Sequence, residues 1–365
     1  MRKGSVDKPY LATVIALLSI GAIAFISASM GVLAKDGTQF ASVMFRHIFF
    51  GLVLGSIACF IFSRIQYKVW RAHALVVFIA SGVLMLLVFI PGLGLTLNGA
   101  RRWIDIGGLS LQPVAFFNMG LIVYWAAWLA FVKEKVSEVR YGLVPILVLL
   151  GIAGALLLAQ PDTDSFVILC VTALAMFLVA GAKIRHLLAL GALGIVAIAI
   201  LSLLRPYVWA RIETFINPSA NGQTSGYQVQ QSLIAIGSGQ VFGRGIGQSI
   251  QKYKFLPESM SDSIFAVFAE ELGFVGCVSI LFLFIFFAFR SFRIAVRAPD
   301  TFSGLVVVGV TVLIVTQSLI NIGSVIGAIP FSGTPLIFFS QGGTSLFMIL
   351  AQIGIVLNIS RTVTR

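Results

Sequence analysis

The residue best suited to acid–base chemistry is Asp262, which stands in the sequence Ser261-Asp262-Ser263 directly before a long apolar run. If that run is a helix, its dipole favours the ionised form of a carboxylate at the N-terminus. An ionised aspartate at a water–lipid boundary can accept a proton from a substrate hydroxyl. Ser261 or Asp262 could equally be an ordinary N-cap of this helix. Glu258, just upstream, is a second acid that we place at the same site.

Two arginines have the chemistry and the position to bind a phosphate group. Arg46 lies within an apolar run, and Arg102 follows another such run. Guanidinium groups bind phosphate oxygens in a bidentate manner, although arginines at these depths also anchor helices at the membrane interface. We predict that Arg46 and Arg102 contact substrate, with Lys252 as a further cation close to Asp262 in the sequence.

Glu270 and Glu271 lie deeper in the apolar run that follows Asp262. Carboxylates inside a membrane helix are functional candidates by default. We favour the alternative that they cap or bridge neighbouring helices. Because adjacent residues on a helix face different directions, at most one of them can share a cavity with Asp262.

The elements that must position these residues are membrane helices. Of the 365 residues, 59% are hydrophobic and only 10% are charged, and the mean hydropathy is +1.03. A soluble domain carries about 25% charged residues, so this chain must place most of its surface in lipid. The net charge of +12 does not indicate a nucleic-acid partner, because the basic residues gather in short loops between apolar runs. The histidines and cysteines show no metal-ligand spacing, so no metal site is predicted from them.

A bilayer core requires about 20 apolar residues per helix, and ten runs in the sequence approach that length. We therefore predict an all-α polytopic membrane protein, a single domain over residues 1–365 with ten transmembrane helices. The predicted spans are residues 10–34, 40–63, 74–97, 113–132, 141–159, 165–182, 186–205, 263–290, 303–326 and 335–359.

The distribution of lysine and arginine predicts the orientation. Most of them lie in the loops on one side of the membrane, together with both termini. The positive-inside rule then places both termini in the cytoplasm. The long loop 206–262, between the seventh and eighth spans, faces outward with Glu258 and Asp262. Within it, the spacing of apolar residues predicts an amphipathic or re-entrant helix over residues 227–236. The glycines that follow suit a backbone that approaches a lipid headgroup or passes close to a helix.

Several motifs, in their order along the chain, resemble the FtsW/RodA/SpoVE (SEDS) family. They are Asn98-Gly99-Ala100-Arg101-Arg102-Trp103, Gln112-Pro113, Gln160-Pro161-Asp162, Tyr227 with Gln231, Gly243-Arg244-Gly245-Ile246-Gly247, Leu256-Pro257-Glu258, Asp262-Ser263-Ile264-Phe265-Ala266, Glu270-Glu271-Leu272-Gly273, Asn321-Ile322-Gly323 and Gln341-Gly342-Gly343-Thr344-Ser345. The segment around Lys252 is more similar to FtsW than to RodA. Together the motifs extend over nearly the whole chain.

The resemblance implies a glycosyltransferase of the bacterial plasma membrane that polymerises lipid II into peptidoglycan on the outer face. The family's essential aspartate falls on Asp262, which would deprotonate the acceptor sugar. Arg46 and Arg102 would stabilise the undecaprenyl pyrophosphate that leaves. We predict Glu258, Lys252, Asp162 and Gln231 as further substrate-binding residues. The implied partners are a class B penicillin-binding protein and other membrane proteins of the division or elongation complex.

The chain departs from the family after Gln112-Pro113, where the family usually continues Ser-Glu-Leu-Ala-Lys. In this chain the residues are Val114-Ala115-Phe116-Phe117-Asn118, so an acid and a base are missing. Two alternatives stay open on the sequence: a transporter that flips lipid II, and a non-catalytic scaffold of the cell-wall complex. No cofactor is evident, although a divalent cation (Mg²⁺ or Mn²⁺) could bridge pyrophosphate and Asp262 or Glu258.

Overall fold

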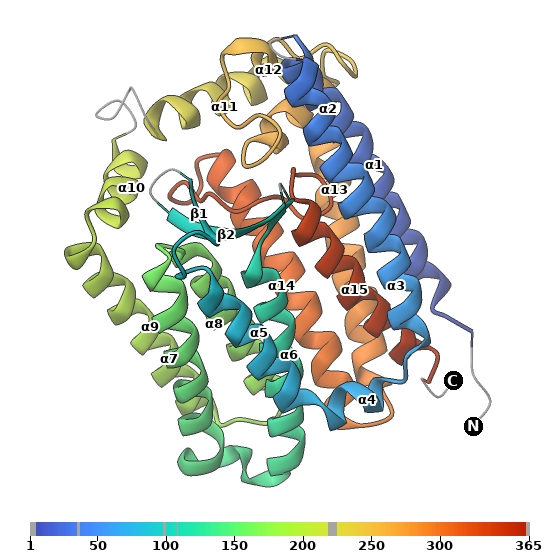
Figure 1. The fold of residues 1–365 in the computed structure, drawn as a ribbon, viewed down its shortest axis with the longest axis vertical. Helices are drawn as coiled ribbons and strands as arrows, with labels where there is room; N and C mark the ends of the chain where they lie inside the picture. The colour runs from blue at the N-terminus through green and yellow to red at the C-terminus, as the bar shows by residue number, and fades with distance from the viewer. Residues whose placement is uncertain (1–4, 35–36, 98–99, 108, 218–224, 363–365) are drawn as a thin grey trace.

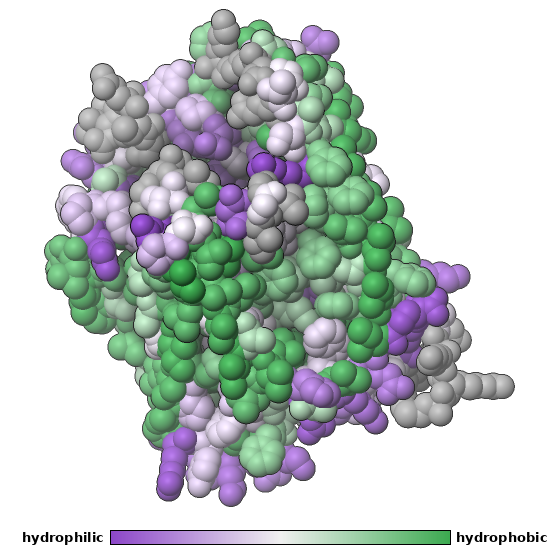
Figure 2. All heavy atoms as spheres, viewed as in Figure 1, coloured by the Kyte–Doolittle hydropathy of each residue, from purple (hydrophilic) through white to green (hydrophobic). Residues whose placement is uncertain are grey.

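The computed structural model describes residues 5–34, 37–97, 100–107, 109–217 and 225–362. It is a bundle of long apolar helices with a small sheet and three further helices gathered at one end (Figure 1). The start of the first helix and the end of the last lie together at the opposite end, where the Asp7 amide donates to the Ser360 hydroxyl over 3.3 Å. Figure 2 shows hydrophobic side chains over the middle of the bundle and hydrophilic ones towards its two ends.

Long helices form the body of the bundle. In chain order they are α1 (Lys8–Leu33), a continuous segment made of α2 (Gly37–Phe45), the π-helix η1 (Arg46–Val53) and α3 (Leu54–Arg64), then α5 (Ala74–Leu87), α6 (Pro113–Val132), α7 (Val144–Ala159), α8 (Thr163–Val179), α9 (Ile184–Leu204), α13 (Ile264–Val296), α14 (Thr301–Val325) and α15 (Gly343–Ser360).

Shorter elements complete the chain. At the end of the bundle where the termini lie, these are α4 (Tyr67–Ala72), the 3-10 helix η2 (Lys133–Ser137) and the π-helix η3 (Val139–Leu143). At the other end lie the strands β1 (Gly94–Leu97), β2 (Ala100–Ile106) and β3 (Leu109–Leu111), and the helices α10 (Pro206–Ile216), α11 (Ser225–Gly239) and α12 (Gln251–Lys254).

Burial is unequal among the helices. In the apolar windows of α14 and α15, 72% and 78% of the residues are buried, whereas only 6% are buried in α9. The centre of the bundle is therefore formed by α14 and α15 with α6, and α9 lies at its edge, against α8 and α10. Capping residues define where some helices begin: Asp7 accepts from the Tyr10 amide at the start of α1, and Asp300 forms a capping box at the start of α14.

Each of the ten predicted spans falls on a helix. In the described part of the chain, eight helical segments are long and apolar enough to cross a membrane. The other two, Ala74–Leu87 and Thr163–Val179, are apolar but shorter. The mostly helical membrane fold is thus as predicted.

The third predicted span, residues 74–97, was too long at its C-terminal end, where the mostly helical fold includes a small sheet. The helix ends at Leu87, and the strands β1, β2 and β3 that follow form an antiparallel sheet in the order β1-β2-β3. In this sheet Gly94 pairs with Ile104, and Asp105 pairs with Ser110. Pro91 and the positive φ of Gly92 (+90°) disfavour continuation of the helix, and the apolar residues of β1 imitated a longer span.

The last predicted span, residues 335–359, was also too long at its N-terminal end. The helix α15 begins only at Gly343, and the preceding residues are extended or in turns. They make hydrogen bonds to the loop before α13: the Gln341 amide donates to the Met260 carbonyl over 2.8 Å, and the Ser340 hydroxyl donates to the Ser261 carbonyl over 2.5 Å. These apolar residues are buried without being helical.

Candidate active site

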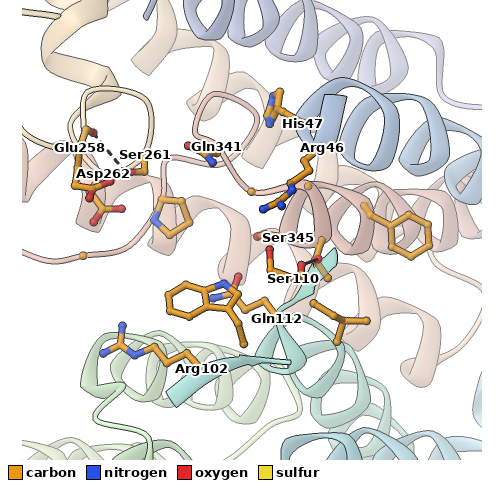
Figure 3. Close-up of a pocket in the computed structure, with 18 of the residues that line it drawn as sticks. Arg46, His47, Arg102, Ser110, Gln112, Glu258, Ser261, Asp262, Gln341 and Ser345 are labelled. Atoms are coloured by element: carbon orange, nitrogen blue, oxygen red, sulfur yellow. Dashed lines mark hydrogen bonds between the residues drawn. The ribbon is translucent and has the colours of Figure 1, made fainter. Parts of the chain in front are cut away.

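A cavity of about 860 Å³ opens between the sheet, the ends of the bundle helices nearest to it and the loop before α13. Segments from almost the whole length of the chain line it (Figure 3). Its polar lining consists of Arg46, His47, Arg102, Ser110, Gln112, Arg211, Gln228, Glu258, Ser261, Asp262, Gln341, Thr344 and Ser345. Four of the predicted site residues are therefore brought together: Asp262, Glu258, Arg46 and Arg102.

Asp262 is held at the cavity wall by its backbone. Its carbonyl accepts a hydrogen bond from Asn321 Nδ2 over 2.8 Å, and the same nitrogen donates to the Thr334 carbonyl over 2.7 Å. The N-cap of α13 is Ser263, and its side chain makes no capping hydrogen bond. The N-cap alternative for Ser261 and Asp262 is therefore wrong, and the Asp262 carboxylate lines the cavity instead.

The surroundings of Asp262 raise its pKa to about 7. Desolvation by burial is the main cause, and the negative charges of Glu258 and Asp164 add to it. The positive charges of Arg102 and Arg211 act in the opposite direction. A carboxylate whose pKa lies near neutrality is suited to general-base catalysis, because it is partly ionised and still basic enough to take a proton.

Glu258 is exposed and points to the same side of the cavity as Asp262 (Figure 3). Its Oε2 accepts from the Ser261 hydroxyl over 2.6 Å, and its carbonyl accepts from the Ser263 amide over 3.1 Å. Glu258 adopts a positive φ of +49°, an unusual conformation for a residue with a side chain. The loop that carries both acids is thus tightly folded.

Arg211, on α10, was not predicted as a site residue. Its Nη1 donates to both carboxylate oxygens of Asp164, over 2.9 and 2.8 Å. A Cβ placed on Gly333 would lie 3.4 Å from Asp262 Oδ2 and 3.8 Å from Arg211 Nη2, so the acid and the guanidinium flank the same glycine. No sequence motif singled out Arg211; only its location in the predicted outer loop could have indicated it.

Arg102, on β2, is held by the turn before α8. Its Nε donates to the Gln160 carbonyl over 3.3 Å, and its Nη2 donates to the Pro161 carbonyl. Its Nη1 lies 4.0 Å from Asp162 Oδ1. Arg46, the first residue of η1, lines the cavity from another side.

Asp162 does not line the cavity. It is buried, and its carboxylate caps α8 by accepting from the Ser165 amide over 3.3 Å and from the Ser165 hydroxyl over 2.8 Å. Burial raises its pKa, and the charge of Arg102 opposes that effect. In this geometry Asp162 supports Arg102 from behind.

Lys252 lies apart from the main cavity. Its Nζ is buried and donates to Glu271 Oε1 over 2.7 Å, to the Gly247 carbonyl over 2.8 Å and to the Ser27 hydroxyl over 3.0 Å. The residue borders a smaller cavity of about 260 Å³, together with Glu258 and Tyr227.

Gln231, on α11, is partly buried and is not among the residues that line the main cavity. Gln228, one turn earlier on the same helix, lines it instead and donates to the Ser263 hydroxyl over 2.9 Å. The predicted helix over residues 227–236 is confirmed by α11.

The two acids within α13 bind the glycine-rich loop. Glu270 accepts from the Ser249 hydroxyl over 2.5 Å and from the Ile250 amide over 3.1 Å. Glu271 accepts from the Ser27 hydroxyl over 2.6 Å, besides Lys252. A Cβ on Gly243 would collide with the Glu271 carbonyl. Glu270 also accepts from the Gln251 amide at the start of α12 over 3.3 Å, and Ser27 belongs to α1. The role of capping or bridging neighbouring helices is confirmed for both acids, and of the two alternatives for the glycines the structure shows the close passage along a helix.

Known proteins resemble this chain over its full length. The sequence model of the FtsW/RodA/SpoVE family, described as "Cell cycle protein", matches residues 8–365. Stage V sporulation protein E of Bacillus subtilis (strain 168) is 39% identical over 99% of this chain and 98% of its own length. A protein of Trichlorobacter lovleyi, named a probable peptidoglycan glycosyltransferase FtsW, is 36% identical over 98% of this chain and 94% of its own.

Solved structures agree with these sequence relationships. One, described as the structural coordination of polymerization and crosslinking by a peptidoglycan synthase complex, contains a chain with a TM-score of 0.80 and 26% identity, covering 98% of both chains. The crystal structure of the rod shape determining protein RodA of Thermus thermophilus gives a TM-score of 0.71 at 26% identity, covering 99% of this chain and 98% of that one.

Proposed function

Because this chain belongs to the FtsW/RodA/SpoVE family, we propose that it is a peptidoglycan glycosyltransferase that polymerises lipid II on the outer face of the bacterial plasma membrane. The observation that carries the proposal is the position of Asp262, whose carboxylate lines a cavity shared with Arg46, Arg102 and Arg211. The cavity joins a base to cations, as the transfer of a sugar from a diphosphate carrier requires.

In the proposed reaction Asp262 accepts the proton of the acceptor sugar's hydroxyl. The hydroxyl oxygen attacks the anomeric carbon of the donor, and the bond from that carbon to the diphosphate oxygen breaks. Its electron pair leaves with the undecaprenyl diphosphate, whose charge the arginines stabilise. Glu258 lies beside Asp262 and is placed to contact a sugar. For Asp162, Lys252 and Gln231, support at this cavity is indirect, since none of them lines it.

The proposed partner is a class B penicillin-binding protein, which would crosslink the glycan that this chain makes. Its support is the similarity to a chain of a peptidoglycan synthase complex. Membrane proteins of the division or elongation complex are proposed as further partners. Membrane orientation with both termini in the cytoplasm belongs to the same proposal, since it places the cavity on the side where lipid II is consumed.

A divalent cation bound between the diphosphate and the acids of the site is a further part of the proposal. The described residues contain no cluster of three or more histidine, cysteine, aspartate or glutamate side chains arranged to hold a metal. Glu258 and Asp262 offer carboxylate oxygens of the kind that Mg²⁺ or Mn²⁺ prefers, and diphosphate oxygens would have to complete the ligand set.

The test is polymerisation of labelled lipid II by the purified chain, with and without a class B partner. Asp262→Asn should lower the rate by about 10²–10⁴-fold, the range for loss of a general base. Asp105→Asn, an exposed aspartate on β2 outside the cavity, is the matched control. Glycan ladders from Asp262→Asn equal to those of the wild type would refute the proposal. If Asp262→Asn still moved lipid II across vesicle membranes but made no polymer, the chain would also be a transporter of lipid II, and that activity would not need Asp262 as a base.

A further inference from the structure

The non-helical segment between α14 and α15 binds the loop that carries Asp262. The Gln341 amide donates to the Met260 carbonyl over 2.8 Å, and the Ser340 hydroxyl donates to the Ser261 carbonyl over 2.5 Å. In Figure 3, Gln341 lies beside the turn that holds Ser261 and Asp262. Two successive carbonyls of this loop are therefore held by the same segment.

The next carbonyl of the loop, that of Asp262 itself, is held by α14. Asn321, near the C-terminal end of this helix, donates from Nδ2 to the Asp262 carbonyl over 2.8 Å and to the Thr334 carbonyl over 2.7 Å. Carbonyl oxygens only accept hydrogen bonds, so both protons of this amide are used. One nitrogen thus joins the proposed base to the segment that precedes α15.

Thr334 lies in the segment that forms the cavity wall beside the Asp262 carboxylate. Its neighbours Gly333 and Pro335 line the cavity. A Cβ on Gly333 would lie 3.4 Å from Asp262 Oδ2, so the wall and the carboxylate are close together. Asn321 therefore fixes the backbone of Asp262 relative to the wall beside its carboxylate.

The hydrogen bonds of Asn321 are made at a cost in stability. The residue is fully buried, and in the described structure its Oδ1 has no hydrogen-bond partner, which is unfavourable. Asn358, at the other end of the bundle, differs in this respect. Its Nδ2 donates to the Ser63 carbonyl over 2.9 Å, and its Oδ1 accepts from the Tyr67 amide over 3.0 Å. Departures from full pairing of the kind seen at Asn321 are typical of functional sites.

From this geometry we infer that Asn321 and Ser340 are positioning residues for Asp262. The inference rests on the proposed function. Neither Asn321 nor Ser340 lines the cavity, so both act through Asp262 and not on the substrate. Their hydrogen bonds hold the backbone that carries the carboxylate, and so set the direction from which the carboxylate meets the acceptor hydroxyl. A displacement of about 1 Å at a reacting group can lower a rate about 10²-fold.

The test is polymerisation of labelled lipid II by the purified full chain in detergent, with kcat and KM measured separately. Asn321→Ala and Ser340→Ala should each lower kcat at least about tenfold. KM should stay within about twofold of the wild-type value, because substrate binding is not altered. Ser340→Ala removes only a hydroxyl group, so it tests the inference even if Asn321→Ala does not fold. Wild-type kcat in a folded variant would overturn the role of the residue that it replaces.

A second measurement separates positioning of the base from a general effect on the fold. In an Asp262→Asn background, Asn321→Ala should cause no further loss of the residual kcat, because the base that it positions is absent. A purely structural role would lower kcat by the same factor in both backgrounds, and that result would overturn the inference.

The matched control is Asn358→Ala, which also removes a buried amide that bridges two backbone groups. It should lower the melting temperature, because the Ser63 carbonyl and the Tyr67 amide lose their partner, and it should keep the wild-type kcat. A loss of kcat as large as that of Asn321→Ala would show that any such bridge has this effect, and would overturn the inference. Wild-type polymerisation by Asp262→Asn would instead refute the proposed function.

Discussion

At the scale of single residues, the protonation of Asp262 determines the pH range in which it can act as a base. Its pKa is raised to about 7, chiefly by burial. The base form is ionised above the pKa, so kcat/KM for lipid II should be constant at alkaline pH. Below pH 7 it should fall about tenfold per pH unit, as for one ionising base. A profile that stays flat down to pH 5 would contradict either the role of Asp262 as the base or the raised pKa of its carboxyl group.

Two neighbours should move that profile in opposite directions. Arg211 lowers the pKa of Asp262 and Glu258 raises it. Arg211→Gln should therefore shift the midpoint of the pH profile upward and Glu258→Gln downward, each by about one pH unit. Polymerisation measured from pH 5 to 9 tests both shifts. A purely structural role for either residue would lower the rate at every pH without moving the midpoint.

The sequence identified only some of the residues at the cavity, and the reason is physical. Asp262, Glu258, Arg46 and Arg102 were recognised because a charged group beside an apolar run is expensive unless it has a use. Arg211 and Gln228, in the long loop, carry no such signal. They reach the cavity only because α10 and α11 converge on it, and that convergence depends on tertiary packing.

At the scale of elements, the buried pair of Lys252 and Glu271 attaches the glycine-rich loop to α13 and α1. Lys252→Ala should destabilise the protein by about 3–5 kcal/mol, because the buried Glu271 carboxylate would lose its cation. Thermal unfolding in detergent provides the measurement, with exposed Lys68→Ala as the control. The double variant Lys252→Met/Glu271→Gln should recover part of the loss. Equal melting temperatures for Lys252→Ala and the wild type would contradict the role.

Prediction of the elements succeeded where hydropathy and helix coincide. Each of the ten apolar runs contains a helix, because backbone groups in lipid must be satisfied within the segment. It failed at residues 94–97 and 335–342, which are apolar but not helical. There other hydrogen bonds satisfy the backbone: those between β1 and β2 in the first case, and those of local turns and of the loop before α13 in the second. Hydropathy indicates that a segment is in an apolar environment. It does not distinguish a helix from a buried segment whose backbone groups find other hydrogen-bond partners.

At the scale of the whole molecule, the two ends of the bundle differ (Figure 1). One end is covered by the sheet, α10, α11 and the loop that carries Asp262, and the other holds the start of α1 and the C-terminal end of α15. Most lysines and arginines belong to loops at the end of the bundle where α1 starts and α15 finishes. The positive-inside rule therefore predicts that the covered end, with the cavity, faces outward. The proposed function requires this orientation.

Cysteine labelling can test the orientation directly. The background lacks Cys59, Cys170 and Cys277. Single cysteines replace Asp105 on β2 and Glu134 on η2, which are exposed residues at opposite ends of the bundle. In intact spheroplasts a membrane-impermeant maleimide should label Asp105→Cys and leave Glu134→Cys unlabelled until the membrane is permeabilised. The reverse pattern would place Asp262 in the cytoplasm. A base on that side could not elongate glycan on the outer face, so the proposed function would fail together with the orientation.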